Sequence, residues 1–170
     1  MNYSDSPPSE TQPALASFRI VVQMDSRHIT PVRRVVAEIA KSIGLADDMA
    51  SRLALAAHEL MENALKYSVD PDRSVRLRLS IEAGQKAQVT VSNASNRACY
   101  EQTQQRVRQI NRSDDPAELY QAMIAKSLKR KRGSGLGLAR IRAEADMQLH
   151  CVLRGDMLSV RATLATGAQP

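Results

Sequence analysis

Three polar residues with different chemistry lie on one face of a segment that the sequence predicts to be helical. Glu59 precedes Asn63 by four positions, and Lys66 follows three positions later; this spacing makes them neighbours on an α-helix. A carboxylate can take a proton from a nucleophile, an amide oxygen can bind Mg²⁺, and an ammonium group can meet a phosphate. Taken alone, the three residues are also compatible with a solvent-exposed helix face.

A glycine-rich run further along the chain is suited to bind an anion. Its residues are Gly133, Ser134, Gly135, Leu136, Gly137 and Leu138. Glycine lets the backbone approach a ligand closely, and the N–H groups at the start of the helix that follows offer an anion site. Five basic residues lie just before it, within residues 126–132. Alone the run is compatible with a flexible turn, but together with the helix above it predicts a triphosphate site.

The remaining elements must bring these two motifs together. Within residues 52–67, five apolar residues form the opposite stripe of the helix: Leu53, Ala57, Leu60, Met61 and Ala64. Hydrophobic periodicity and turn residues give the expected order of elements along the chain. That order is a strand over 18–24, a helix from Thr30-Pro31 to Gly44, a helix from 47 or 48 to 67, strands over 75–83 and 87–94, a polar helical stretch over 96–128 with a break at 113–116, the glycine loop, a helix over 138–145, and strands over 148–153 and 158–164.

Strands and helices are segregated in this order, which predicts an α+β fold. We expect a two-layer sandwich of a mixed, mostly antiparallel sheet with helices on one face. Residues 18–166 are predicted to form one domain, because 170 residues rarely make two. Residues 1–17, rich in Ser, Pro and Gln, are predicted to be a disordered tail.

The composition narrows the class of protein. Hydrophobic residues make up 43% of the chain and charged residues 25%, as in ordinary globular proteins. No apolar run reaches the roughly 20 residues that a membrane span needs, and the N-terminus does not resemble a secretory signal. Cys99 and Cys151 lie too far apart for a zinc site. These features predict a cytoplasmic protein that does not bind membranes.

The positive net charge excludes fewer classes of binding partner than the composition excludes classes of protein. A net charge of +6 and a pI of about 9.7 are compatible with nucleic acid, an acidic protein or the phosphates of a nucleotide. Aromatic residues make up only 3% of the chain, which disfavours a stacking platform for single-stranded nucleic acid. A nucleic-acid binder is therefore the least favoured of the three readings.

Two boxes give the sequence a family resemblance. Glu59-x-x-x-Asn63-Ala64-x-Lys66-Tyr67-Ser68 resembles the N-box of GHKL ATPases, and Gly133-x-Gly135-Leu136-Gly137-Leu138 resembles their glycine-rich lid box. The resemblance covers about residues 18 to 165. It implies the Bergerat α/β sandwich, with ATP held between helices and sheet. It also implies that Asn63 ligates Mg²⁺, that Glu59 is the general base, that Lys66 lies near phosphate, and that residues 133–138 wrap the phosphates.

The subfamily follows from the layout of the chain. A free-standing domain with Glu at the first N-box position resembles the anti-sigma-factor serine kinases and related partner-switch kinases. The resemblance implies an ATP-dependent serine/threonine kinase that phosphorylates a small antagonist-type protein. The implied partners are that anti-anti-sigma-like protein or a sigma factor, and a homodimer is compatible with the family.

One box departs from the family pattern. The family has Asp-x-Gly-x-Gly after the strand that follows the N-box, and this chain has Asn93 at the Asp position without the glycines. An asparagine oxygen can still accept a hydrogen bond from the adenine amino group, so Asn93 is predicted to read adenine. The alternative hypothesis is a degenerate domain that sequesters a protein partner without phosphoryl transfer.

Overall fold

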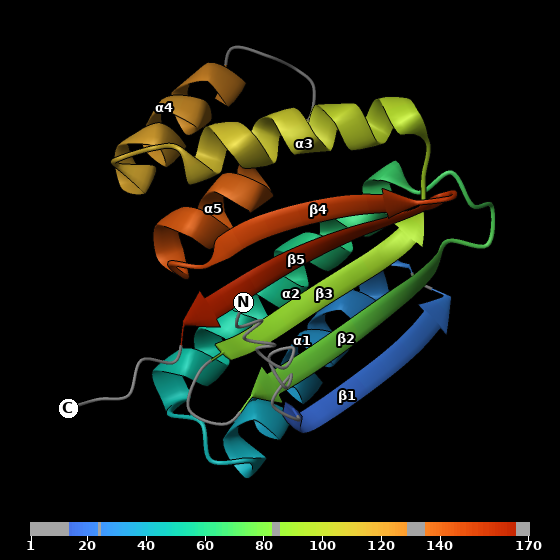
Figure 1. Cartoon of the computed structure of the whole chain (residues 1–170), viewed down its shortest axis with the longest axis vertical. Coiled ribbons are helices and arrows are strands. Elements are labelled where there is room, and N and C mark those ends of the chain that lie inside the picture. Colours follow the sequence, from blue (N-terminus) through green and yellow to red (C-terminus); the bar gives the residue numbers. More distant parts are fainter. Residues whose placement is uncertain (1–13, 24, 83–85, 129–134, 166–170) are drawn as a thin grey trace, which may run out of the picture.

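The computed structural model describes residues 14–23, 25–82, 86–128 and 135–165, which form five strands and five helices. The strands are β1 (Ala14–Gln23), β2 (Ser74–Glu82), β3 (Lys86–Ala94), β4 (Gln148–Arg154) and β5 (Met157–Ala165). The helices are α1 (Ser26–Ser42), α2 (Asp47–Tyr67), α3 (Arg97–Asn111), α4 (Pro116–Leu128) and α5 (Leu136–Glu144). Figure 1 shows their arrangement.

The five strands form one sheet in the order β1-β2-β3-β5-β4. Every pairing between these strands is antiparallel, so the parallel component allowed for in the predicted mixed sheet is not found among the described strands. Both predicted hairpins, β2-β3 and β4-β5, are confirmed. The central place of β3 lets its carboxyl end, which carries Asn93, lie between two neighbouring strands.

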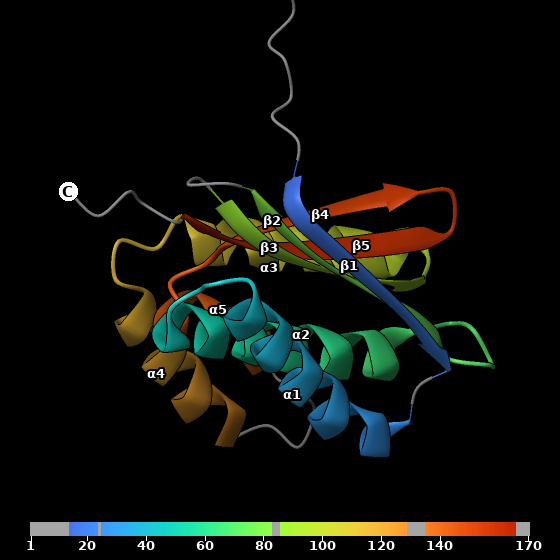
Figure 2. The ribbon, with the colours of Figure 1, turned by 90° about the horizontal axis from the view of Figure 1, so that it is seen from below.

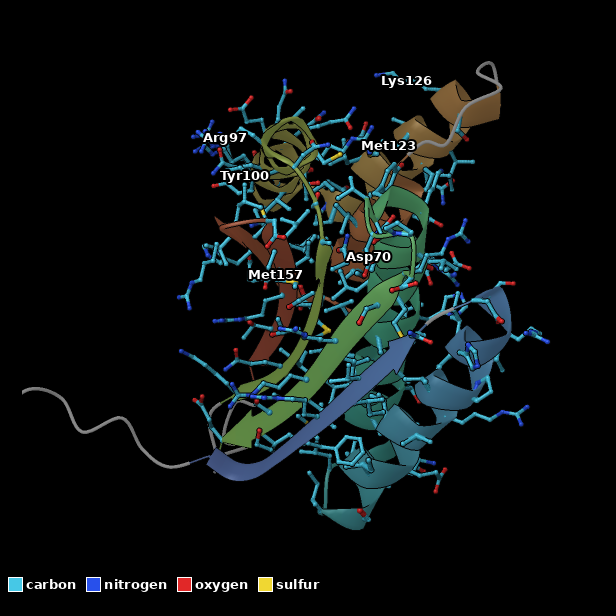
Figure 3. All side chains as sticks on the ribbon, turned by 90° about the vertical axis from the view of Figure 1, so that its right-hand side faces the viewer. Asp70, Arg97, Tyr100, Met123, Lys126 and Met157 are labelled. Carbon is cyan, nitrogen blue, oxygen red and sulfur yellow. The ribbon has the colours of Figure 1, made fainter. Side chains whose placement is uncertain are left out.

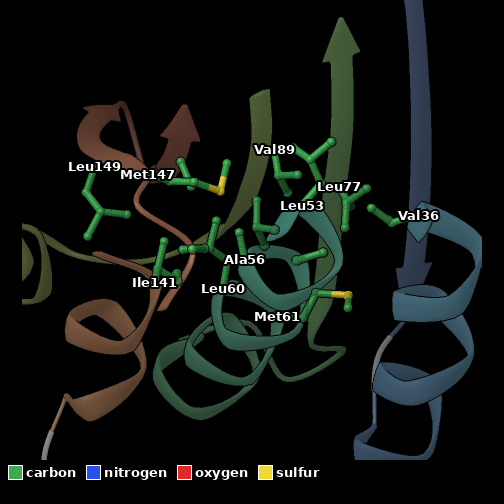
Figure 4. Close-up of a cluster of buried hydrophobic side chains, with 14 of the residues drawn as sticks. Val36, Leu53, Ala56, Leu60, Met61, Leu77, Val89, Ile141, Met147 and Leu149 are labelled. Atoms are coloured by element: carbon green, nitrogen blue, oxygen red, sulfur yellow. The ribbon is translucent and has the colours of Figure 1, made fainter. Parts of the chain in front are cut away.

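Helices α1, α2 and α5 form a second layer on one face of the sheet, which confirms the predicted α+β sandwich. Figure 2 shows α1, α2 and α5 on the same side of the strands. Helix α2 packs on β3 and β2, and α5 packs on α2 and β4. The core lies between these layers, where Leu53, Leu60 and Met61 of α2 are buried in one cluster with Val89 of β3 and Met147 (Figure 4). The alternation of buried and exposed residues along β2 and β3 leaves the other face of the sheet open to solvent.

The predicted start of the first helix, at Pro31, is wrong by five residues. Helix α1 begins at Ser26, with Asp25 as its N-cap, and Pro31 lies inside the helix. The Asp25 carboxylate accepts a hydrogen bond from the Arg27 N–H at 2.8 Å, and the Asp25 N–H donates to Nδ1 of His28 at 3.1 Å. This reciprocal cap uses histidine where the common pattern has Glu or Gln. It fixes the helix start upstream of Pro31. Proline has no N–H, so residue 31 cannot donate the helical hydrogen bond to the Arg27 carbonyl.

The predicted helical stretch after β3 is confirmed, including its break. Helix α3 ends at Asn111, and α4 begins at Pro116, where the Asp115 carboxylate accepts a hydrogen bond from the Glu118 N–H at 2.8 Å. Asn111 also joins α3 to the edge strand β4, because its side chain donates to the Leu149 carbonyl at 2.7 Å and accepts from the Leu149 N–H at 3.2 Å. None of the described helices is long and apolar enough to cross a membrane.

Candidate functional site

Helix α2 turns its polar face toward the start of α5. Its apolar stripe is buried as predicted, with Leu53, Leu60 and Met61 almost completely covered. The opposite face is not simply solvated, because Glu59 is only 7% exposed. Asn63 is half-buried, and its Nδ2 atom is buried without a hydrogen-bond partner among the described residues. A buried polar group left without a partner is costly, so this amide is a candidate ligand-binding group.

The start of α5 lies directly against this face. Gly135 is the N-cap of α5 and has a φ of 63°, a left-handed conformation that favours glycine. Gly137 needs its small size for another reason. A Cβ atom placed on Gly137 would lie 2.5 Å from Oε2 of Glu59 and 3.4 Å from Nδ2 of Asn63. The first N–H groups of a helix attract anions, and here they lie beside the carboxylate and the amide of α2.

The Glu59 carboxylate is held in place by an arginine of α5. Nη1 of Arg140 lies 3.0 Å from Oε1 of Glu59, while Nε of the same arginine lies 2.9 Å from Oε2 of Glu144. The Glu144 carboxylate, followed by that of Glu59, raises the pKa of Arg140 above its usual range, so the arginine stays charged. The Oε1 atom of Glu59 is therefore occupied, and the Oε2 atom faces Gly137.

An outer pocket of about 210 Å³ lies between α2 and the start of α5. Its lining contains most of the predicted site residues: Glu59, Asn63, Lys66, Gly135, Leu136 and Gly137. Lys66 is exposed, and its ammonium group lies 5.3 Å from the centre of the Tyr67 ring. A carboxylate, an amide, an ammonium group and a helix N-terminus thus meet in one pocket.

A smaller inner pocket, which shares Asn63 and Gly135 with the outer pocket, contains Asn93, the residue predicted to bind adenine. Asn93 is 4% exposed and lines this pocket of about 40 Å³ together with Asn63, Gly135 and Leu138. Its Nδ2 donates to the Ala94 carbonyl at 2.9 Å, which leaves the side-chain oxygen as the acceptor for an external donor. The pocket is large enough for water but not for a purine, so an adenine ring requires its walls to move.

The loss of the two glycines after Asn93 has a structural explanation. The two glycines of the family pattern correspond to Ser95 and Arg97, counted from Asn93. Among the described residues other than glycine, only Arg73 and Asp146 have a positive φ, so the backbone here does not need glycine. Asn96 instead caps α3, because its side chain accepts a hydrogen bond from the Cys99 N–H at 2.9 Å. Helix α3 therefore starts at Arg97, the position of the second glycine of the family pattern.

Two arginines of the site were not predicted from the sequence. Arg106 of α3 lines the inner pocket, and a Cβ atom on Gly135 would lie 2.6 Å from its Nη1 atom. Arg140 binds Glu59 from α5. The i, i+4 pair of Arg140 with Glu144 is a signal that the sequence contains, but nothing in it fixes which face of α3 or α5 meets α2. Gly133 and Ser134, the first two residues of the predicted lid box, lie outside the described residues.

The sequence and the fold both match known proteins. Residues 22–151 match the histidine kinase-like ATPase domain family. Among solved structures, a chain in the crystal structure of the SiaB-SiaC complex from Pseudomonas aeruginosa is similar, with a TM-score of 0.64. The two chains are 17% identical, and the alignment covers 90% of each. At that identity the likeness supports the fold alone. No curated protein matches the sequence.

Proposed function

Because the chain belongs to the histidine kinase-like ATPase domain family, we propose that it is an ATP-dependent serine/threonine kinase of a bacterial partner-switching system. Its substrate is a small antagonist-type protein. The observation that carries this proposal is that the side-chain nitrogen of Asn63 is buried without a partner among the described residues. It lies in the pocket that also contains Glu59 and the start of α5. A polar group kept unpaired at that position is understandable if it binds a ligand.

The nucleotide is proposed to lie along the two pockets, which share Asn63 and Gly135. Adenine enters the inner pocket, where the free side-chain oxygen of Asn93 accepts from its amino group. The phosphates extend into the outer pocket, toward Lys66 and the N–H groups that follow Gly135. Arg106 borders the inner pocket beside Gly135, so its guanidinium must shift when the base enters.

The residues around Asn63 also fit a magnesium ion. Mg²⁺ prefers oxygen ligands and is commonly bound through one or two protein groups together with the substrate phosphates. A half-turn of the Asn63 amide would put its oxygen where the unpaired Nδ2 now lies. When bound, the ion would neutralise phosphate charge. One protein ligand is consistent with the absence, among the described residues, of any cluster of three His, Cys, Asp or Glu.

Phosphoryl transfer would use Glu59 as the proton acceptor. The hydroxyl oxygen of the substrate serine attacks the γ-phosphorus of ATP, the bond to the bridging oxygen breaks, and ADP leaves. The hydroxyl proton passes to Oε2 of Glu59, because Oε1 is bound to Arg140. Positioning of the reactants and neutralisation of charge supply most of the rate in such reactions.

A protein partner is supported by the structural relative. The similar chain was crystallised in a complex named for two proteins, SiaB and SiaC. We propose that this chain likewise acts on a partner protein, an anti-anti-sigma-like protein or a sigma factor. The alternative, a degenerate domain that sequesters its partner without phosphoryl transfer, is favoured by one observation: the inner pocket of about 40 Å³ does not accommodate adenine as it stands.

Phosphorylation of a candidate partner distinguishes the two functions. The full chain is mixed with Mg-ATP and, in turn, with each small antagonist-type protein encoded in the source genome. We expect intact-mass spectrometry to show one added phosphoryl group on one of these proteins, on a serine or threonine. A stable complex with one of them, in which no phosphate is transferred at saturating Mg-ATP, would instead establish the sequestering module.

A further inference from the structure

The open face of the sheet, opposite the helices, carries a concentration of arginines. Residues that alternate with the buried positions of the strands point to this face, and they include Arg19, Arg76, Arg78, Arg154 and Arg161, here called the arginine face. Figure 3 shows side chains with blue nitrogen tips projecting from the sheet on the side away from α1 and α2. All five arginines are exposed.

The register places several of these charges in a single row across the sheet. Arg19 of β1 is directly opposite Arg78 of β2, and Arg78 is opposite Thr90 of β3. Thr90 is opposite Arg161 of β5, which is in turn opposite His150 of β4. The row therefore runs across all five strands, about 19 Å at an inter-strand spacing of about 4.8 Å.

Such a row works against the stability of the sheet. Like charges placed directly opposite each other on neighbouring strands are destabilising, as for Arg19 and Arg78. None of the five arginines forms an ion pair with a described residue. Glu82 is the only carboxylate that the described strands place on this face, and it accepts a hydrogen bond from Gln88 at 3.2 Å. A ligand with several negative charges would relieve this repulsion.

The other side chains of the face favour a protein over a nucleic acid. Four of the arginines line a shallow trough of about 610 Å³ together with Val21, Met157 and small hydroxyl residues; Met157 is labelled in Figure 3. Val21 is 58% exposed. Arginine mixed with apolar side chains is typical of protein interfaces. No described Phe, Tyr or Trp lies on this face, since Phe18 pairs with the buried Leu79 and the tyrosines lie on helices, so bases find no stacking platform of these residues.

We propose that the arginine face is a docking surface for an acidic, extended segment of a partner protein. Face-to-face pairing of two copies would bring five arginines against five arginines, so a second copy is not the occupant. The surface lies on the opposite side of the sheet from the α2–α5 pocket. The docking proposal therefore does not depend on phosphoryl transfer, and either can fail without the other.

A charge-reversal pair tests this surface on the full chain. The probe is a fluorescein-labelled peptide of about twelve residues in which glutamate alternates with threonine. Its binding is measured by fluorescence polarisation at low ionic strength. We expect Arg78→Glu combined with Arg161→Glu to weaken binding by about tenfold or more, because the two reversals flank Thr90 at the centre of the row. Amide NMR of the wild-type protein should show the shifts caused by the peptide in β1, β2 and β5.

The matched control changes the same charge on the helix layer. Arg33 and Arg34 are exposed residues of α1, and Arg33→Glu with Arg34→Glu should leave peptide affinity within about twofold. If both double variants weaken binding equally, or if the NMR shifts lie outside the sheet, the arginine face is not the site. Thermal melting checks that the variants fold. If the variant with Arg78→Glu and Arg161→Glu does not fold, Arg78→Gln with Arg161→Gln replaces it.

Two further results would assign the face to another occupant and overturn the proposal. An oligothymidylate of the same length that binds more tightly than the peptide, and loses its affinity in the same variant, would make the face a nucleic-acid surface. A wild-type dimer in sedimentation that becomes monomeric on Arg78→Glu with Arg161→Glu would make it a contact between copies of the chain.

Discussion

Glu59→Gln is expected to lower phosphoryl transfer by a factor of about 10² to 10⁴ while Mg-ATP affinity changes by less than about threefold. Glutamine has the shape of glutamate, and its side-chain oxygen can still accept the hydrogen bond that Arg140 donates to Oε1 at 3.0 Å. It cannot take up the serine proton at neutral pH. Only the step that uses the free Oε2 atom beside Gly137 is therefore lost.

Transfer to the phosphorylated partner and Mg-ATP affinity must be measured on the same preparations. Glu38→Gln is a suitable control, because Glu38 is an exposed carboxylate on α1, outside the pocket lined by α2 and α5. We expect this control to behave like the wild type. Undiminished turnover in Glu59→Gln would remove Glu59 from the mechanism, even if the nucleotide binds as proposed.

Gly137→Ala is expected to reduce transfer about 100-fold and Mg-ATP affinity about tenfold. The added Cβ atom would lie 2.5 Å from Oε2 of Glu59. A carbon and an oxygen atom that are not bonded to each other do not approach so closely. The carboxylate or the first turn of α5 must then move, and displacement of a reacting group by about 1 Å can cost about 100-fold in rate. We expect these losses of transfer and affinity although alanine favours helix formation over glycine by up to about 1 kcal/mol.

Gly44→Ala is the matched glycine variant for this experiment. Nothing lies within 4 Å of a Cβ atom on Gly44, but its φ of 88° disfavours alanine. We therefore expect Gly44→Ala to lower the melting temperature and to leave nucleotide affinity and transfer unchanged. Wild-type affinity and turnover in Gly137→Ala would show that the close approach of α5 to Glu59 plays no part in the reaction.

The features that could be predicted from the sequence are those set by local pattern. The 3.6-residue period of α2 identified both its buried stripe and its polar face, and the alternation along β2 and β3 identified a hairpin. The order of elements then predicted the sandwich. Glu59 and Asn63 lie in one pocket with Gly135 and Gly137 because that order brings α5 onto α2.

The features that could not be predicted depend on tertiary packing. The roles of Arg106 and Arg140 follow from how α3 and α5 are rotated against α2, which no local pattern specifies. The burial of Glu59 had the same origin, since a carboxylate on a polar helix face is usually exposed. The start of α1 was misplaced because a proline favours the first turn of a helix, whereas here His28 completes a cap at Asp25.

Calorimetric titration of Mg-ATP into the wild type, Asn63→Ala and Asn111→Ala tests the central claim most directly, which is that the α2–α5 pocket binds the nucleotide. Loss of a charge-assisted contact predicts that Asn63→Ala binds Mg-ATP about 10- to 100-fold more weakly. Its melting temperature should not fall, because the Asn63 Nδ2 has no partner to lose among the described residues. Asn111→Ala should show the reverse, since it loses two hydrogen bonds to Leu149 and touches neither pocket. Mg-ATP affinity that is equal in the wild type and Asn63→Ala, or a wild type that binds no nucleotide at millimolar ATP, would contradict the assignment of this pocket.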